Sequence, residues 1–190
     1  MRALLATVAS FAALVLGPVA SADTTTVEDG RNARGNLLDI KSATAAHRGG
    51  LLQHTIRTYR VWSSSELRSS SRRPRLIAVY VWKAQRNSRV KQDFEVLARF
   101  RNGKLRGSVI RVRPRKKTVA RFVVRRLDRR SITLAFGANV IGNPRAYLWQ
   151  AVSGFTGKGC PKVKRFQFGC DDSAPTGEAR EHDLTAQTDG

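Results

Sequence analysis

One alternating stretch followed by a turn signal constrains the fold of this chain more than any other feature. Between residues 93 and 101 apolar side chains recur at every second position, and the dipeptide Asn102-Gly103 follows directly. Alternation with a period of two is typical of a strand that is buried on one face. Asn-Gly is the preferred pair for a two-residue type I′ turn. The pattern therefore predicts an antiparallel β-hairpin centred on these two residues.

Further strands are predicted on both sides of this hairpin. Short segments rich in β-branched and aromatic residues recur along the chain and are separated by clusters of Gly, Pro and Ser. No segment keeps a helical period, although residues 138–143 would accommodate a single turn of helix. Eight or nine short strands at this spacing predict an all-β chain that forms a single antiparallel β-sandwich. The further strands are expected at 37–43, 51–59, 75–82, 118–126, 131–136 and 146–153.

The inward positions of these strands define the expected core. Residues 76–82 are continuously apolar, which is typical of a central strand covered on both faces. In the neighbouring strands the apolar residues alternate with polar ones, so one face is expected to be solvated. The side chains expected in the core are Phe94, Val96, Phe100, Phe122, Val124, Ile132, Leu134 and Phe136.

The N-terminus has the layout of a secretory signal peptide. Arg2 precedes an apolar run at residues 3–16, and a Gly17-Pro18 break is followed by the small-residue triplet Ala20-Ser21-Ala22. The apolar run is shorter than the roughly 20 residues that a membrane-spanning helix needs, so a membrane anchor is the weaker alternative. We expect cleavage after Ala22, secretion of the remainder to the extracellular side, and no membrane span in the mature protein.

Changes in composition divide the rest of the chain into three parts. Residues 23–36 are polar and interrupted by glycine, which indicates a flexible lead-in. Residues 37–170 hold the predicted strands and form the β-sandwich domain. Residues 171–190 are acidic, small and polar, which favours a disordered acidic tail because there is little apolar surface to bury.

The chain contains two cysteines, Cys160 and Cys170. In an exported protein such a pair is expected to form a disulfide, here pinning the loop that holds Phe166 and Phe168. A metal or redox site fits less well because no histidine lies nearby. By chain-entropy reasoning, closing this short loop stabilises the folded state by about 2.5 to 3 kcal/mol.

A series of short motifs follows one another within residues 29–175. They are Leu38-Asp39-Ile40, Leu52-Gln53-His54-Thr55-Ile56, Trp62, Asp93 and Tyr147-Leu148-Trp149-Gln150-Ala151. In this order the motifs resemble those of uncharacterised bacterial secreted β-sandwich domains. The resemblance implies a jelly-roll-like fold, and no reaction is assigned to that group.

The same resemblance raises the question of calcium. Members of that group often carry an Asp-rich, calcium-loop-like turn after the central strand. In this chain the corresponding residues 83–91 contain no acid. Because calcium requires several oxygen ligands, usually carboxylates, we expect no calcium there, and no other metal or cofactor is indicated.

The potential catalytic residues do not form a recognisable sequence motif. Three carboxylates could supply a pair, Asp39, Asp93 and Glu95, but no pattern unites two of them. HExxH, Gly-x-Ser-x-Gly and glycine-rich phosphate-loop motifs do not occur. The histidines fall in a predicted turn, a strand and the tail, so we expect no shared site and a protein that is not an enzyme. The three histidines are His47, His54 and His182.

The distribution of charge carries more functional information. The formal net charge is +21, and it falls to +20 when Arg2 is removed with the signal peptide. Residues 67–130 hold 22 Lys or Arg against three acids, a net charge of +19 within 64 residues. Nearly all of the positive excess therefore lies on the middle strands and their turns.

The predicted hairpin concentrates part of this charge on one surface. Its two-residue turn places Arg101 opposite Lys104 and Arg99 opposite Arg106, all away from the apolar side. Like charges that are directly opposed destabilise a sheet by a few tenths of a kcal/mol or more. Residues 121 and 125 should point the same way if their strand joins that sheet. The candidate anion-binding residues are Arg99, Arg101, Lys104, Arg106, Arg121 and Arg125.

These features favour a secreted, non-catalytic binding domain. Its expected partner is an anionic polysaccharide or a phosphate-rich polymer of a cell surface or extracellular matrix. A structural or protein-interaction domain whose charge serves solubility stays open as the alternative, and a hydrolase is a third option. Specific recognition of nucleic acid is not expected, because the aromatic residues that could stack on bases are mostly assigned inward.

Overall fold

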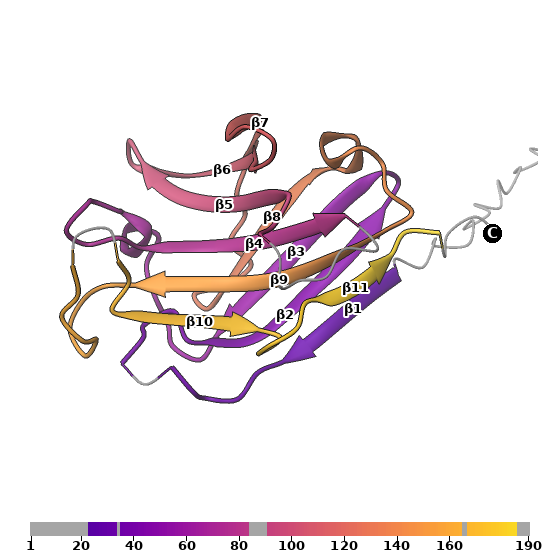
Figure 1. The fold of residues 1–190 in the computed structure, drawn as a ribbon. Helices are drawn as coiled ribbons and strands as arrows, with labels where there is room; N and C mark the ends of the chain where they lie inside the picture. The colour runs from indigo at the N-terminus through magenta and orange to yellow at the C-terminus, as the bar shows by residue number, and fades with distance from the viewer. Residues whose placement is uncertain (1–22, 34, 84–90, 165–166, 186–190) are drawn as a thin grey trace, which may run out of the picture.

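The protein folds as a sandwich of two antiparallel β-sheets (Figure 1). The computed structural model describes residues 23–33, 35–83, 91–164 and 167–185, so the predicted signal peptide lies outside the described residues. Within these ranges there are eleven strands and no α-helix, and thus no helix long and apolar enough to span a membrane. The prediction of an all-β antiparallel β-sandwich is confirmed. In chain order the strands are β1 Asp23–Glu28, β2 Ile40–Arg48, β3 Leu51–Thr58, β4 Leu76–Lys83, β5 Phe94–Arg101, β6 Lys104–Arg111, β7 Lys117–Val123, β8 Ser131–Gly137, β9 Ala146–Phe155, β10 Cys170–Ala174 and β11 Arg180–Asp183.

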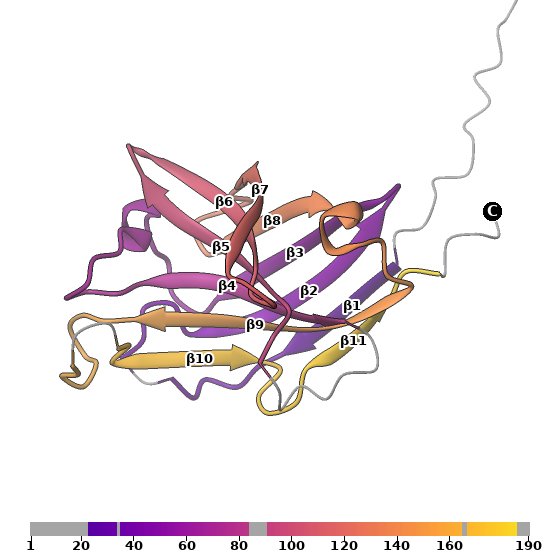
Figure 2. The ribbon, with the colours of Figure 1, turned by 45° about the horizontal axis from the view of Figure 1, so that its top comes forward.

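The two sheets differ in size. One has four strands in the order β1-β2-β3-β8. The other has seven, in the order β10-β9-β4-β5-β6-β7, with β11 pairing with β9 beside β10. Figure 2 shows the smaller sheet behind the larger one, with the inner faces of the two turned toward each other. Every strand pair is antiparallel.

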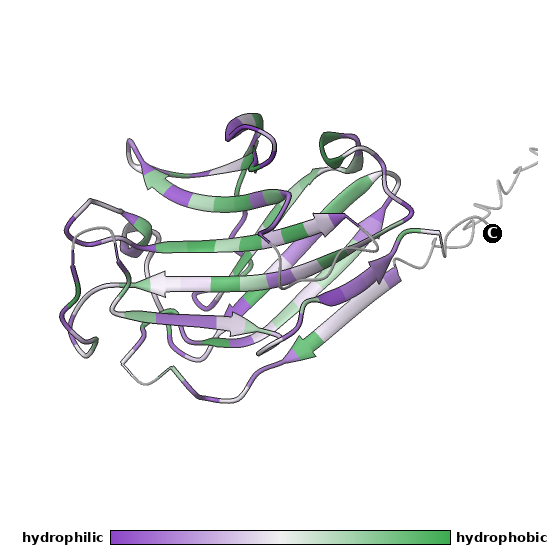
Figure 3. Ribbon diagram, in the orientation of Figure 1, coloured by the Kyte–Doolittle hydropathy of each residue, from purple (hydrophilic) through white to green (hydrophobic). Residues whose placement is uncertain are grey.

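The predicted hairpin is present as β5 and β6. Asn102 has a φ of 50° and Gly103 a φ of 74°, and a type I′ turn requires positive φ at both positions. The turn sets the register, in which Arg101 pairs with Lys104 at the tip. The alternation of apolar and polar residues along these strands is visible in Figure 3.

The core lies between the inner faces of the sheets, and β4 has a second apolar cluster on its outer face. Ile77 and Val79 belong to the main core, whereas Ala78 packs outward with Leu97 and Ile110. The expectation that this central strand is covered on both faces is confirmed. Of the eight predicted core side chains, six are buried, and Phe100 and Phe122 are half-buried and pack against the core.

Strands at both ends of the chain correct two predictions. Residues 23–36 are not a flexible lead-in throughout, because β1 pairs with β2 along its whole length. Residues 171–190 are not a disordered tail throughout, because β10 and β11 both pair with β9. These additions also raise the strand number from the expected eight or nine to eleven. An edge strand buries a single row of side chains, so small residues suffice and the backbone hydrogen bonds supply the remaining stabilisation.

Two smaller predictions are confirmed. Cys160 and Cys170 form a disulfide with an S–S distance of 2.08 Å and a Cα–Cα distance of 5.4 Å. The single helical turn expected at 138–143 is a 3-10 turn at Ala138–Ile141. Part of the loop closed by the disulfide, including residue 166, and the turn at 84–90 that bears on calcium lie outside the described residues.

Candidate functional sites

The predicted basic residues of the hairpin form one continuous charged surface. Arg99 pairs with Arg106 and Arg101 pairs with Lys104, and all four side chains are exposed. Cβ atoms of directly opposed residues lie roughly 5 Å apart. Because the apolar residues between these positions turn toward the core, the four cations share the outer face of the larger sheet.

Arg121 extends this surface onto β7. It lies opposite Ser108, which is two residues after Arg106 and therefore on the same face of the sheet. Its side chain is exposed as well. We name these five residues the basic face. In the part of the chain that the structure describes, no ion pair involves any of them. The basic face consists of Arg99, Arg101, Lys104, Arg106 and Arg121.

Arg125 does not belong to the basic face, which corrects the prediction. The strand expected to run to residue 126 ends at Val123, and the chain then crosses to the other sheet. There Arg125 exchanges backbone hydrogen bonds with Thr133 of β8, at 3.2 and 2.8 Å. Its exposed side chain points away from the core, on the outer surface of the four-stranded sheet. Alternation continues through the buried Val124, so the sequence pattern does not reveal the change of sheet.

The connection between β3 and β4 lies against the hairpin and adds to its positive surroundings. Residues 69–71 and Pro74 line a shallow hollow of about 310 Å³ together with Arg99 and Arg101. The guanidinium carbon of Arg68 lies 5.4 Å from the ring centre of Phe100, a cation–π contact. This connection is therefore part of the same surface region as the basic face.

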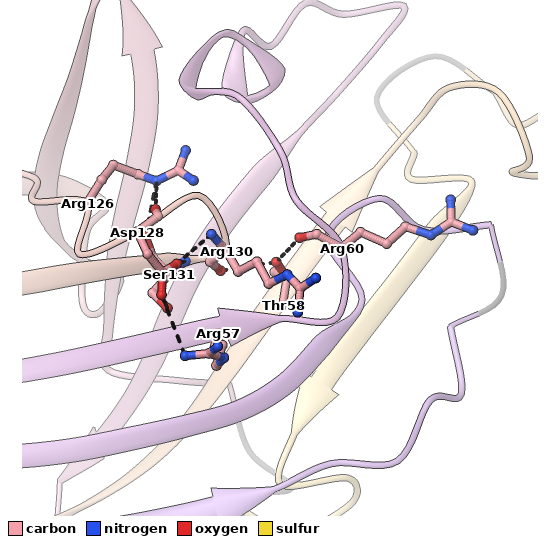
Figure 4. A network of polar contacts seen from close by, with 7 residues as sticks. All are labelled: Arg57, Thr58, Arg60, Arg126, Asp128, Arg130 and Ser131. Atoms are coloured by element: carbon pink, nitrogen blue, oxygen red, sulfur yellow. Dashed lines mark hydrogen bonds and ion pairs between the residues drawn. The ribbon is translucent and has the colours of Figure 1, made fainter.

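Other arginines of the basic segment have structural roles in the loop before β8 (Figure 4). The carboxylate of Asp128 accepts the backbone N–H of Arg130 at 2.6 Å and forms an ion pair with Arg57 at 3.5 Å. The Arg130 N–H is the main cause that holds the pKa of Asp128 below its ordinary value. Arg126 lies 3.7 Å from the ring centre of Trp62 and donates to its carbonyl oxygen at 3.1 Å. Part of the arginine excess thus holds a loop.

The three carboxylates considered as catalytic candidates are not brought together. Asp93 accepts the backbone N–H of Lys83 at 3.0 Å, next to the pairing of β4 with β5. Glu95 forms an ion pair with Lys116 at 3.4 Å. Asp39 lies apart from both, in a loop before β2.

Asp39 instead lies near Asp172, which belongs to the region expected to be a disordered tail. Its carboxyl group lies close enough to that of Asp172 in β10 for the two to interact electrostatically. Burial raises the pKa of Asp172 to about 7, and the nearby Asp29 and Asp39 contribute, although the backbone N–H of Ile40 opposes the change at 2.6 Å. Burial also raises the pKa of Asp39. Two carboxyl groups in this arrangement disfavour each other's ionisation.

The structure gathers all three histidines at one end of the sandwich, contrary to the expectation that they share no site. His47 Nδ1 lies 3.3 Å from His182 Nε2, and the ring centres of these residues are 5.4 Å apart. Tyr147, opposite His182 in β9, bonds through its hydroxyl group to His54 Nε2 at 3.1 Å. Each histidine comes from a different strand, β2, β3 or β11, and each is buried.

Asp23 completes a group of possible metal ligands with two of these histidines. It is the cross-strand neighbour of His47 at the start of β1 and is half-buried. One potential ligand atom from each of Asp23, His47 and His182 lies within 4.8 Å of the others. Thr25 Oγ1 lies 2.9 Å from the second ring nitrogen of His182.

Burial keeps the imidazoles of His54 and His182 neutral. It lowers the pKa of His54 to about 3, and burial together with the neighbouring His47 lowers the pKa of His182. Burial raises the pKa of Tyr147, so its phenol stays protonated. His47 Nε2 and His54 Nδ1 are buried without a hydrogen-bond partner among the described residues. At neutral pH His54 and His182 therefore present uncharged ring nitrogens.

Sequence reasoning missed this cluster because its members come from distant segments. His47 and His182 are 135 positions apart, and the strand that carries His182 was expected to be disordered. The sequence of this strand, Arg180 to Asp183, contains no apolar residue, so no local pattern indicated it.

No protein-family model, no curated protein sequence and no solved structure matches this chain. The resemblance to bacterial secreted domains stays a prediction. Any inference about function is therefore based on the residues of this chain and their arrangement.

Proposed function

We propose that this protein is a secreted, non-catalytic binding module whose basic face holds anionic polymers of a cell surface or extracellular matrix. The observation that carries the proposal is the set of opposed cations on β5 and β6, which lack ion-pair partners in the described structure. The disulfide between Cys160 and Cys170 fits an oxidising, extracellular location.

The electrostatics of the hairpin favour an anionic partner. Each opposed pair, Arg99 with Arg106 and Arg101 with Lys104, repels across the sheet and lowers its stability. A ligand that places negative charge above the pairs removes this repulsion. When the protein's cations neutralise charges on the polymer, counterions condensed on the polymer are released, and this release drives binding at low salt.

The spacing of the cations suits a polymer rather than a small anion. Along one strand, successive side chains on a face are about 6.6 to 6.8 Å apart, and across the hairpin they are roughly 5 Å apart. The basic face therefore forms a short ladder of charge over three adjacent strands, β5, β6 and β7. A chain with a negative group on each repeating unit can engage several of these cations at once.

A salt series on a charge variant tests the proposal. We expect the quadruple variant Arg99→Gln, Arg101→Gln, Lys104→Gln and Arg106→Gln to keep its fold or gain slightly in stability, because the like-charge repulsion is gone. Its affinity for polyphosphate and polygalacturonate should fall. Since each contact contributes about 0.7 to 0.9 to the slope of log affinity against log salt, the slope should become shallower by about 3.

A matched control separates the basic face from net charge. The connection at residues 69–75 is unsuitable because it lines the hollow beside Arg99 and Arg101. Four exposed cations elsewhere provide the same change of charge, and their replacement by Gln should leave most of the affinity. Equal losses in the two variants would show that the charge acts only as a diffuse field, and the proposal would fail. The control positions are Lys41, Arg48, Arg145 and Lys162.

An exposed apolar side chain supports the alternative that the protein binds another protein. Val123, opposite Arg106 at the edge of the basic face, is 79% exposed. If neither quadruple variant loses affinity for the polymers, the alternative moves ahead and a protein partner that covers Val123 should be sought.

A further inference from the structure

We propose that Asp23, His47 and His182 form a binding site for a divalent first-row transition-metal ion, with zinc and copper as the best-fitting metals. The site is independent of the basic face. It lies where β1, β2 and β11 meet, at the end of the sandwich opposite to the Asn102-Gly103 turn.

The distance between the two histidines fits joint ligation. His47 Nδ1 and His182 Nε2 are 3.3 Å apart. Two nitrogens bound to one tetrahedral zinc ion at about 2.0 to 2.1 Å lie about 3.3 to 3.4 Å from each other. The distance between the two nitrogens is therefore already that of a pair bound to one ion.

The remaining ring nitrogen of His182 has a suitable partner. Thr25 Oγ1 lies 2.9 Å from Nδ1, so an Nδ1–H group can donate to the hydroxyl oxygen. This tautomer leaves the lone pair on Nε2, the atom that faces His47. A hydrogen bond to the non-ligating nitrogen is the usual way in which proteins orient a metal-binding histidine.

The position of the cluster allows an ion to enter and then to be held. His47 and His182 are buried, with exposed fractions of 5% and 0%, whereas Asp23 is half-buried at the edge of the sandwich. The carboxylate therefore faces solvent first and places a negative charge beside the two imidazoles.

The donor set narrows the choice of metal. Imidazole nitrogen suits zinc, copper, nickel and iron, whereas calcium and magnesium prefer oxygen ligands alone. Two nitrogens and one carboxylate leave a fourth position for water or another small ligand, as in sites with three protein ligands. Among divalent ions of this series, copper is expected to bind most tightly.

Metal titration of untagged protein tests the proposal. The protein is treated with a chelator, dialysed, and titrated separately with zinc and copper salts. We expect one equivalent of either ion to bind, and the electron paramagnetic resonance spectrum of the copper form should show coupling to two imidazole nitrogens. His182→Gln should remove one of these couplings.

A matched pair of carboxylate variants keeps the proposal falsifiable if the histidine variant does not fold. Asp23→Ala removes a ligand at a half-buried position, so zinc affinity should fall by about 100-fold, since even groups behind the ligands contribute 10- to 100-fold. Asp183→Ala removes an exposed carboxylate next to His182 that is not in the ligand group, so it should lower the affinity far less. Failure of the wild type to take up either ion, or equal affinities in the two variants, would overturn the proposal.

Discussion

Replacing one carboxyl group of the Asp39–Asp172 pair should change how the stability of the protein depends on pH. Asp172 accepts backbone N–H groups from Ile40 at 2.6 Å and from Ser173 at 2.9 Å, and the charge of the buried Asp39 acts on it. Asp172→Asn keeps the size of the side chain and makes it neutral at every pH. The variant therefore imitates the protonated form of the wild type.

The size of the effect follows from the pKa of Asp172, which burial raises from 3.8 to about 7. Because the folded state binds the proton more tightly than the unfolded state, the stabilisation is complete below about pH 4 and is lost as pH rises through 7. The full change in pKa corresponds to about 4 kcal/mol. Asp172 keeps some contact with solvent, so we expect about 2 to 3 kcal/mol.

The histidine cluster produces the opposite trend, so the variant must be compared with the wild type at each pH. Burial lowers the pKa of His54 to about 3. Its stabilisation is complete above about pH 6.5 and is lost as pH falls toward 3. This contribution is common to both proteins, and their difference isolates Asp172.

Urea denaturation at several pH values between about 5 and 8 is the suitable assay. Relative to wild type, Asp172→Asn should gain about 1 to 2 kcal/mol in free energy of unfolding between the two ends of this range, because part of the total effect falls below pH 5. Asp171→Asn, at an exposed position of the same strand, serves as the control and should follow the wild type. Parallel profiles for wild type and Asp172→Asn would refute the reasoning, because they would show that Asp172 is ionised throughout.

Two further predictions concern the loops. Replacing both Cys160 and Cys170 by Ser should lower the free energy of unfolding by about 2.5 to 3 kcal/mol in denaturant titrations, and labelling of both thiols in the unreduced wild type would contradict the bond. Arg126→Gln removes the contact with Trp62 and a charged hydrogen bond, so stability measured by circular dichroism should fall by about 1 to 3 kcal/mol, whereas an unchanged value would assign Arg126 to the solvated surface.

The middle of the fold was predictable from sequence because its signals are local. The Asn102-Gly103 turn and the alternation of apolar residues around it determine the pairing of β5 with β6 without reference to distant residues. The same alternation identified the inward side chains of β7 and β8. The basic face followed, because the register of a two-residue hairpin decides which side chains are opposed.

The ends of the fold and the second site were not predictable in this way. β1 and β11 contain few apolar residues, and they are strands because neighbouring strands supply backbone partners. The histidine cluster depends on the placement of β11 beside β9, a long-range contact with no local signature. Arg125 illustrates the same limit, since a change of sheet leaves the alternation intact.

The adjacency of β1 and β11 determines how the molecule can be tethered. Thr25 and His182 are in direct contact, so the first and last strands meet at one end of the sandwich. The Asn102-Gly103 turn projects from the other end. A polypeptide or surface attached ahead of β1 or beyond β11 would thus hold the domain with the basic hairpin directed outward. For binding experiments, immobilisation through either terminus should leave the polymer-binding surface accessible, whereas random coupling through lysines would consume Lys104.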